Sequence, residues 1–175
     1  QQAYGSNRDA INSLYSNAIQ NAQGLYGQQT SALQDALNLQ KQNVETSAEK
    51  SLREAYVNKM MNEKNLEQRL TAQGLSGGAS ESAMASVLNQ YGGNRNEIEQ
   101  AKLSDLASAE INYGQNLASL LSGLQSATSS AENARLSGLM NLENSLANQQ
   151  AGLIGDRATQ LQNLYETTLA DQRAR

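Results

Sequence analysis

The residues of this chain that come closest to a catalytic motif are Gly74, Leu75, Ser76, Gly77 and Gly78. Their order matches the Gly-x-Ser-x-Gly pattern of a nucleophilic serine, which needs a His base and a strained turn between a strand and a helix. The chain contains no His, and the flanking residues have helical composition. The same glycines are not followed by Lys-Ser or Lys-Thr, as a phosphate-binding loop requires. The segment therefore predicts a turn between two helices.

Two pairs of glutamates at helical spacing could act as general acids or bind a hard metal ion: Glu45 with Glu49, and Glu63 with Glu67. Helical di-metal sites add histidines to such carboxylates, whereas here basic residues crowd the same stretch. A solvated face with ion pairs four residues apart explains this charge better. The predicted pairs are Lys41 with Glu45, Glu49 with Arg53, Lys50 with Glu54, and Lys59 with Glu63. We therefore expect no enzyme activity, no cofactor and no metal site.

The composition predicts long helices with little to bury. No proline occurs in the 175 residues, so nothing removes a backbone donor from a helix. Gln (20) and Asn (19) are almost as frequent as Leu (24) and Ala (24), and the only aromatic residues are seven Tyr. Helices with so thin a core are stabilised mainly by packing against partners. We expect an all-α protein, an elongated long-helix hairpin or coiled coil that is oligomeric.

Apolar residues recur every eleven positions in the N-terminal part of the chain. A first row contains Ile11, Ala22, Leu33, Val44, Ala55 and Leu66. A second row, four residues later, contains Tyr15, Tyr26, Leu37, Ala48, Lys59 and Leu70. Eleven residues make three turns of about 3.67 residues, which favours a nearly straight or slightly right-handed helical assembly. This pattern predicts a long first helix over residues 1–73.

A Gly/Ser turn at residues 74–80 is predicted to separate that helix from a second helical segment over residues 81–175. Gly74 is expected to end the first helix in the left-handed conformation, with Leu75 folding back on its last turn. The next helix is expected to begin at Gly78 or Ser80. A short turn favours antiparallel packing.

Gly92-Gly93 is a weaker break within the second segment. A kink, a further turn, and glycines tolerated within a continuous helix are all compatible with this pair.

The second segment carries apolar residues at alternating spacings of three and four, the pattern of a heptad seam. Its positions are Leu103, Leu106, Glu110, Tyr113, Leu117, Leu120, Leu124, Ala127, Ala131 and Ala134. Seven residues are predicted to form the seam between helices of an assembly: Ile11, Leu33, Val44, Leu66, Leu117, Leu120 and Leu124. In such an assembly the Gln and Asn positions would face a lumen or solvent.

The charge distribution argues against tight DNA binding. Thirteen basic residues are scattered among seventeen acidic ones, and the net charge is −4. Weak, non-specific DNA contact through the amide side chains is compatible with this composition. Residues 111–131 carry no charge and would be long enough to span a bilayer, but their Asn, Gln, Ser and Thr content disfavours membrane contact.

Residues 69–82, together with Leu88-Asn89-Gln90-Tyr91 and Asn94-Arg95-Asn96, resemble a motif in Gln/Asn/Ala-rich helical minor structural proteins of tailed bacteriophages. The whole chain is more distantly similar to phage DNA pilot or ejection proteins, which are long, amide-rich helices that oligomerise into a tube. The resemblance implies an internal, channel-associated or ejected virion protein in the particle interior or the portal-tail channel, which reaches the host envelope on delivery. The implied partners are further copies of the chain and portal or tail components. The alternatives are a secreted or surface coiled-coil stalk, and an assembly scaffold or chaperone.

Overall fold

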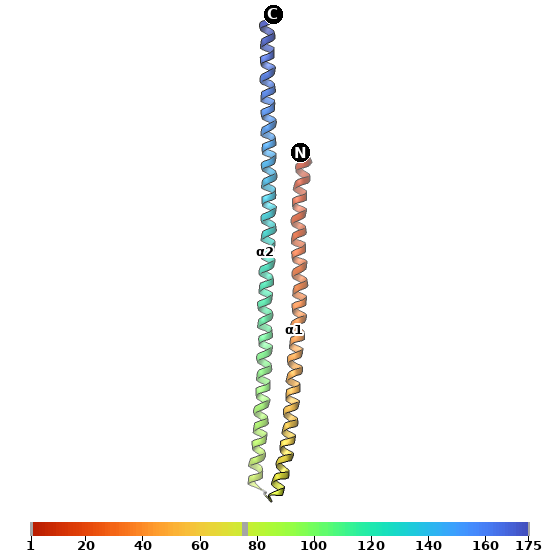
Figure 1. Ribbon diagram of the computed structural model, residues 1–175, viewed down its shortest axis with the longest axis vertical. Helices are drawn as coiled ribbons and strands as arrows, with labels where there is room; N and C mark the ends of the chain where they lie inside the picture. Colours follow the sequence, from red (N-terminus) through yellow and green to blue (C-terminus); the bar gives the residue numbers. More distant parts are fainter. Residues whose placement is uncertain (1, 75–76, 175) are drawn as a thin grey trace. The chain divides into compact units, whose positions relative to one another are not determined.

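The computed structural model describes residues 2–74 and 77–174, and it places almost all of them in two helices (Figure 1). Helix α1 spans Gln2–Ala72 and helix α2 spans Gly78–Ala174. No strand occurs in the two described ranges. Gln1, Arg175, and the turn residues Leu75 and Ser76 lie outside them. The predicted all-α class is confirmed, whereas the oligomeric state stays a prediction.

Two glycines with positive φ angles shape the connection between the helices. Gly74 has a φ of 65°, and its N–H donates to the carbonyl oxygen of Thr71 at 3.2 Å. Gly77 has a φ of 77°, and its carbonyl oxygen accepts hydrogen bonds from the N–H groups of Ser80 and Glu81. Left-handed backbone carries little strain at glycine because no Cβ is present. These two positions therefore end α1 and start α2.

Helix α2 begins at Gly78 and is continuous through Gly92 and Gly93. Of the three outcomes that the sequence left open for this pair, the structure has glycines tolerated within a continuous helix. A Cβ added at either position would meet no atom within 4 Å. Packing therefore does not require glycine at this point of α2.

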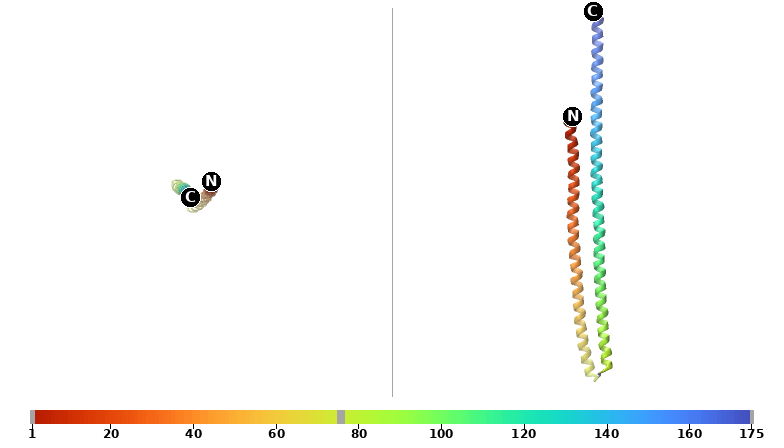
Figure 2. Two further views of the ribbon diagram at one scale, coloured as in Figure 1. Left: turned by 90° about the horizontal axis from the view of Figure 1, so that it is seen from above. Right: turned by 180° about the vertical axis from the view of Figure 1, so that it is seen from behind.

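The chain divides into two compact units, each built from segments of both helices. Unit 1 contains Gln1–Tyr26 and Leu121–Arg175, and unit 2 contains Gly27–Leu120. Within each unit the two helical segments lie side by side (Figures 1 and 2). They run antiparallel in unit 2, where Lys41 contacts Glu110 and Tyr56 contacts Tyr91. In unit 1, Tyr15 lies against Arg135.

The exposure of α1 side chains repeats every eleven residues from Ile11 to Leu70. Every member of the two predicted rows is buried or half-buried, so the eleven-residue period is confirmed for this helix. The structure adds a third row that the sequence analysis missed, consisting of Ile19, Thr30, Lys41, Leu52 and Glu63. Three of these five residues are polar, and for this reason a search for apolar periodicity does not find them.

Helix α2 follows the same eleven-residue spacing, and the predicted heptad seam is wrong. Its half-buried or buried residues include Ile98, Lys102, Leu106, Ala109, Tyr113, Leu117, Leu120, Leu124, Thr128, Ala131, Arg135, Leu139, Leu142 and Leu146. Four predicted heptad positions are instead exposed: Leu103, Glu110, Ala127 and Ala134. At 3.6 residues per turn, seven residues fall about 20° short of two turns and eleven residues pass three turns by about 20°, so the drift per residue is smaller at the longer repeat. Helix α2 therefore has the same eleven-residue spacing as α1.

The hydrophobic core is thin, as the composition implies. Among the described residues, the hydrophobic side chains that are almost fully buried are Leu37, Ala48 and Ala109. All three belong to unit 2, and two of them are alanines. Most of the apolar contact in this protein therefore comes from half-buried side chains.

Candidate functional site

The contact between α1 and α2 in unit 1 is centred on Arg135. Its guanidinium carbon lies 5.1 Å from the centroid of the Tyr15 ring, and its Nε donates to Oδ1 of Asn12 at 2.9 Å. A guanidinium on an aromatic face gains from the ring quadrupole, and its long stem adds apolar contact. Arg135 therefore joins α2 to two neighbouring side chains of α1 at once.

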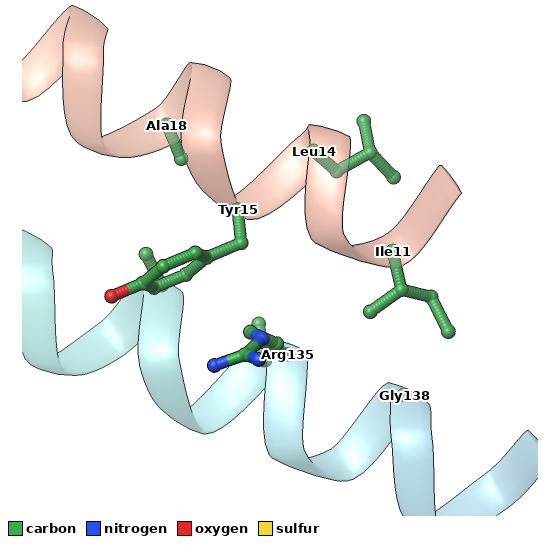
Figure 3. Close-up of a pocket in the computed structure, with 8 residues that line it drawn as sticks. Ile11, Leu14, Tyr15, Ala18, Arg135 and Gly138 are labelled. Carbon is green, nitrogen blue, oxygen red and sulfur yellow. The ribbon is translucent and has the colours of Figure 1, made fainter. Parts of the chain in front are cut away.

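Gly138 lies one turn beyond Arg135 and accommodates Ile11. A Cβ at position 138 would lie 3.4 Å from Cδ1 of Ile11, a distance at the edge of ordinary contact. Figure 3 shows Ile11 directed toward α2 at Gly138, and Leu14 directed away from α2. The absence of a side chain at Gly138 therefore leaves room for the branched residue opposite.

A groove of about 430 Å³ lies along this contact. Its lining residues are Ile11, Leu14, Tyr15, Ala18, Ala131, Ala134, Arg135 and Gly138. The groove is apolar except for the Arg135 head group and the Tyr15 hydroxyl. It is open because the alanine side chains are small and Gly138 has none, so the space between the helices is not filled. Such a surface offers apolar contact and one cation, and it brings together no acid–base pair.

Two tyrosines and Lys59 join the helices in unit 2. The rings of Tyr56 and Tyr91 meet edge to face, with centroids 6.4 Å apart and planes inclined at 68°. The Nζ atom of Lys59 lies 5.7 Å from the first centroid and 6.0 Å from the second, and 3.1 Å from Oε1 of Glu63. The predicted Lys59–Glu63 pair is thus confirmed. Because Lys59 also faces two aromatic rings, the pair takes part in the contact between α1 and α2.

Lys41 forms its ion pair across the helices and not along α1. Its Nζ atom lies 2.6 Å from Oε1 of Glu110, so the predicted pairing with Glu45 is wrong. The physical reason is position, since Lys41 belongs to the third row of α1, which faces α2. The two remaining predicted pairs, Glu49–Arg53 and Lys50–Glu54, are not among the ion pairs formed by the described residues.

The seven residues predicted as an assembly seam are all half-buried in this single chain. They are Ile11, Leu33, Val44, Leu66, Leu117, Leu120 and Leu124. Leu153, on a part of α2 with no α1 segment beside it, shows that an uncovered leucine of this helix is 67% exposed. The lower exposure of the seven therefore arises from contact within the chain. Their role between copies stays a prediction, and other apolar residues are more accessible for such contacts.

The carboxylate pairs singled out in the sequence do not converge on a site. Glu45, Glu49 and Glu67 are exposed, and Glu63 is paired with Lys59. Over residues 2–74 and 77–174, no three side chains among His, Cys, Asp and Glu come close enough to hold a metal ion. In the same ranges, neither helix contains a stretch that is both long and apolar enough to cross a membrane.

Sequence reasoning missed the contact of Arg135 with Tyr15 and Asn12. Extending the eleven-residue period into α2 would have placed Arg135 in one row with Tyr91, Lys102, Tyr113 and Leu124. The signal was therefore present in the spacing but masked by the charge of the residue. No family model, curated protein or solved structure matches the chain.

Proposed function

We propose that this chain is a structural protein of a tailed bacteriophage particle, internal, channel-associated or ejected, that assists genome delivery. The observation that carries the proposal is that two helices of 71 and 97 residues make up almost all of the described chain and bury only three side chains almost fully. Two long helices provide an extended surface on which other copies or other virion proteins can pack. The resemblance of residues 69–82 to phage structural proteins directs the proposal to a virion.

The seam supports a protein that rearranges during delivery. Its most buried positions include Ala48 and Ala109, and an alanine contributes little free energy on burial compared with the roughly 1.5 to 3 kcal/mol of a large apolar side chain. Helices held by such contacts separate or exchange partners at a low free-energy cost. Assembly in the particle would add the missing stabilisation.

The surface supports weak contact with nucleic acid. The net charge of −4 opposes the attraction to phosphate that drives tight binding, while Gln and Asn side chains offer many neutral hydrogen-bonding groups. DNA would therefore move past such a surface without being held by it.

The proposal is tested by mass spectrometry of purified mature particles, with copy number measured before and after triggered DNA release. We expect a copy number compatible with the symmetry of the portal or tail, and its loss after release. If the protein is present in mature particles and is not lost after DNA release, it is not ejected and is a fixed component of the particle. Absence from mature particles would overturn the virion assignment. In that case presence in immature particles would identify a scaffold, and a self-contained oligomer elsewhere would identify a stalk.

A further inference from the structure

The C-terminal part of α2 carries an apolar face that α1 does not cover. In unit 1, α2 extends past the N-terminal end of α1 (Figure 1). Every residue from 147 to 168 is exposed. Five large apolar side chains in this segment are each 64–70% exposed: Leu153, Ile154, Leu161, Leu164 and Tyr165.

These five residues lie on one face of α2 because their spacings follow the eleven-residue period. Leu153 and Leu164 are eleven residues apart, and so are Ile154 and Tyr165. Leu153 itself follows half-buried Leu142 by eleven residues. The row of Leu142 therefore continues through Leu153 and Leu164 without a covering helix. Ile154 and Tyr165 lie beside this row, in line with the exposed residue Leu121.

A charged residue in the uncovered segment repeats a contact seen in the same unit. Arg157 follows Arg135 by two eleven-residue periods, so it occupies the equivalent position of the helix face. Arg135 stacks on Tyr15 of α1. The uncovered segment contains Tyr165 eight residues after Arg157.

We propose that residues 147–169 form a self-association surface, on which a second copy of the same segment packs antiparallel about Leu161. In a parallel pair, Arg157 would lie beside Arg157 of the partner subunit, and the two charges would repel. In the antiparallel pair, Arg157 lies opposite Tyr165 of the partner subunit. The twofold axis repeats this contact, which copies the Arg135–Tyr15 pairing. The inference stands independently of the phage assignment.

Single-cysteine variants test the pairing directly because the chain has no cysteine of its own. Leu161→Cys lies on the twofold axis and is expected to give a disulfide-linked dimer under mild oxidation. Ile154→Cys alone is expected to remain unlinked, whereas a mixture of Ile154→Cys and Thr168→Cys should cross-link, since these positions face each other across the axis. Efficient self-linking of Ile154→Cys would overturn the antiparallel arrangement in favour of a parallel one.

Sedimentation of the full chain provides a second measurement that does not depend on disulfide geometry. The chain is expected to dimerise, and Leu161→Glu combined with Leu164→Glu should weaken dimerisation at least tenfold while helix content by circular dichroism stays unchanged. The matched control is Leu103→Glu, a similarly exposed leucine of α2 in unit 2, which should leave the dimer intact. Dimerisation that survives the double variant would overturn the proposal. A monomer that binds anionic phospholipid vesicles through the same leucines would also overturn it and assign the face to a membrane.

Discussion

The guanidinium carbon of Arg135 lies 5.1 Å from the centre of the Tyr15 ring, which places a charged residue of α2 over an aromatic residue of α1. The short connection between Ala72 and Gly78 sets the register of the two helices in unit 2, since a slide by one eleven-residue repeat would move them by about 16 Å. Contacts between particular side chains, several of them polar, stabilise the helices in that register.

Replacing Arg135 by Ala is expected to destabilise the protein by about 1–2 kcal/mol. The substitution removes a cation–π contact and a charge-assisted hydrogen bond to Asn12, both partly exposed to solvent. The free energy of unfolding, measured by urea titration with circular dichroism, checks the prediction. Arg53→Ala is the matched control, because Arg53 is exposed on α1 and should change stability by less than about 0.5 kcal/mol. Equal effects at the two positions would contradict the role assigned to Arg135.

Leu37→Ala is expected to cost about 2–3 kcal/mol, the lower part of the range for buried leucines, because the thin core can relax around the change. Leu37 is 8% exposed, whereas Leu39, two residues later, is 59% exposed. Leu39→Ala should therefore have an effect below about 0.5 kcal/mol. Thermal unfolding of both variants followed at 222 nm provides the comparison. A larger loss of stability for Leu39→Ala than for Leu37→Ala would contradict the assignment of Leu37 to the buried face of α1.

Glycine-to-alanine substitutions should change the stability of the protein in opposite directions at two positions. Gly74→Ala is expected to destabilise by about 1–2 kcal/mol because its φ of 65° strains any residue with a Cβ. Gly92→Ala is expected to stabilise by about 0.5–1 kcal/mol because the position is helical and has free space for a methyl group. Melting temperatures of the two variants give the sign directly. A loss of stability at Gly92 would indicate that the glycine pair serves a bend.

The ion pair between Lys41 and Glu110 should show rescue by charge exchange. Lys41→Glu places two carboxylates together and should destabilise unit 2 by up to about 1 kcal/mol, a size typical of exposed pairs. Adding Glu110→Lys should restore most of the loss, and 1 M NaCl should reduce both effects by screening. Denaturant titration of the single and double variants measures the coupling. Additive losses in the double variant would contradict this register of α1 against α2.

Much of the secondary structure follows from local properties of the chain. A proline-free sequence rich in Ala, Leu, Gln and Glu favours helix at nearly every position, and the glycines at 74–78 interrupt it. The eleven-residue period of α1 was visible because Ile11, Leu33, Val44 and Leu66 stand out from polar neighbours. These features need no contact between distant residues.

The buried face of α2 was less accessible from sequence. Leu103 and Leu106 both fit a heptad, yet Leu103 is 66% exposed and Leu106 is half-buried. Lys102, Thr128 and Arg135 occupy half-buried positions, so hydrophobicity does not mark the face. A residue of α2 is buried when α1 covers it, whatever its polarity. The polar ends of these three side chains reach hydrogen-bonding partners or solvent at the edge of the contact between the helices.

The sequence was sufficient for two long helices and the glycine turn between them, because helix propensity and left-handed glycine conformations act over a few residues. The contact of Tyr56 with Tyr91, the ion pair of Lys41 and the stacking of Arg135 depend on residues about 35 to 120 or more positions apart, which meet only when α1 and α2 pack together. The glycine turn sets which residues of the two helices come opposite each other near it, but which polar and aromatic side chains then touch depends on the packing of α1 against α2.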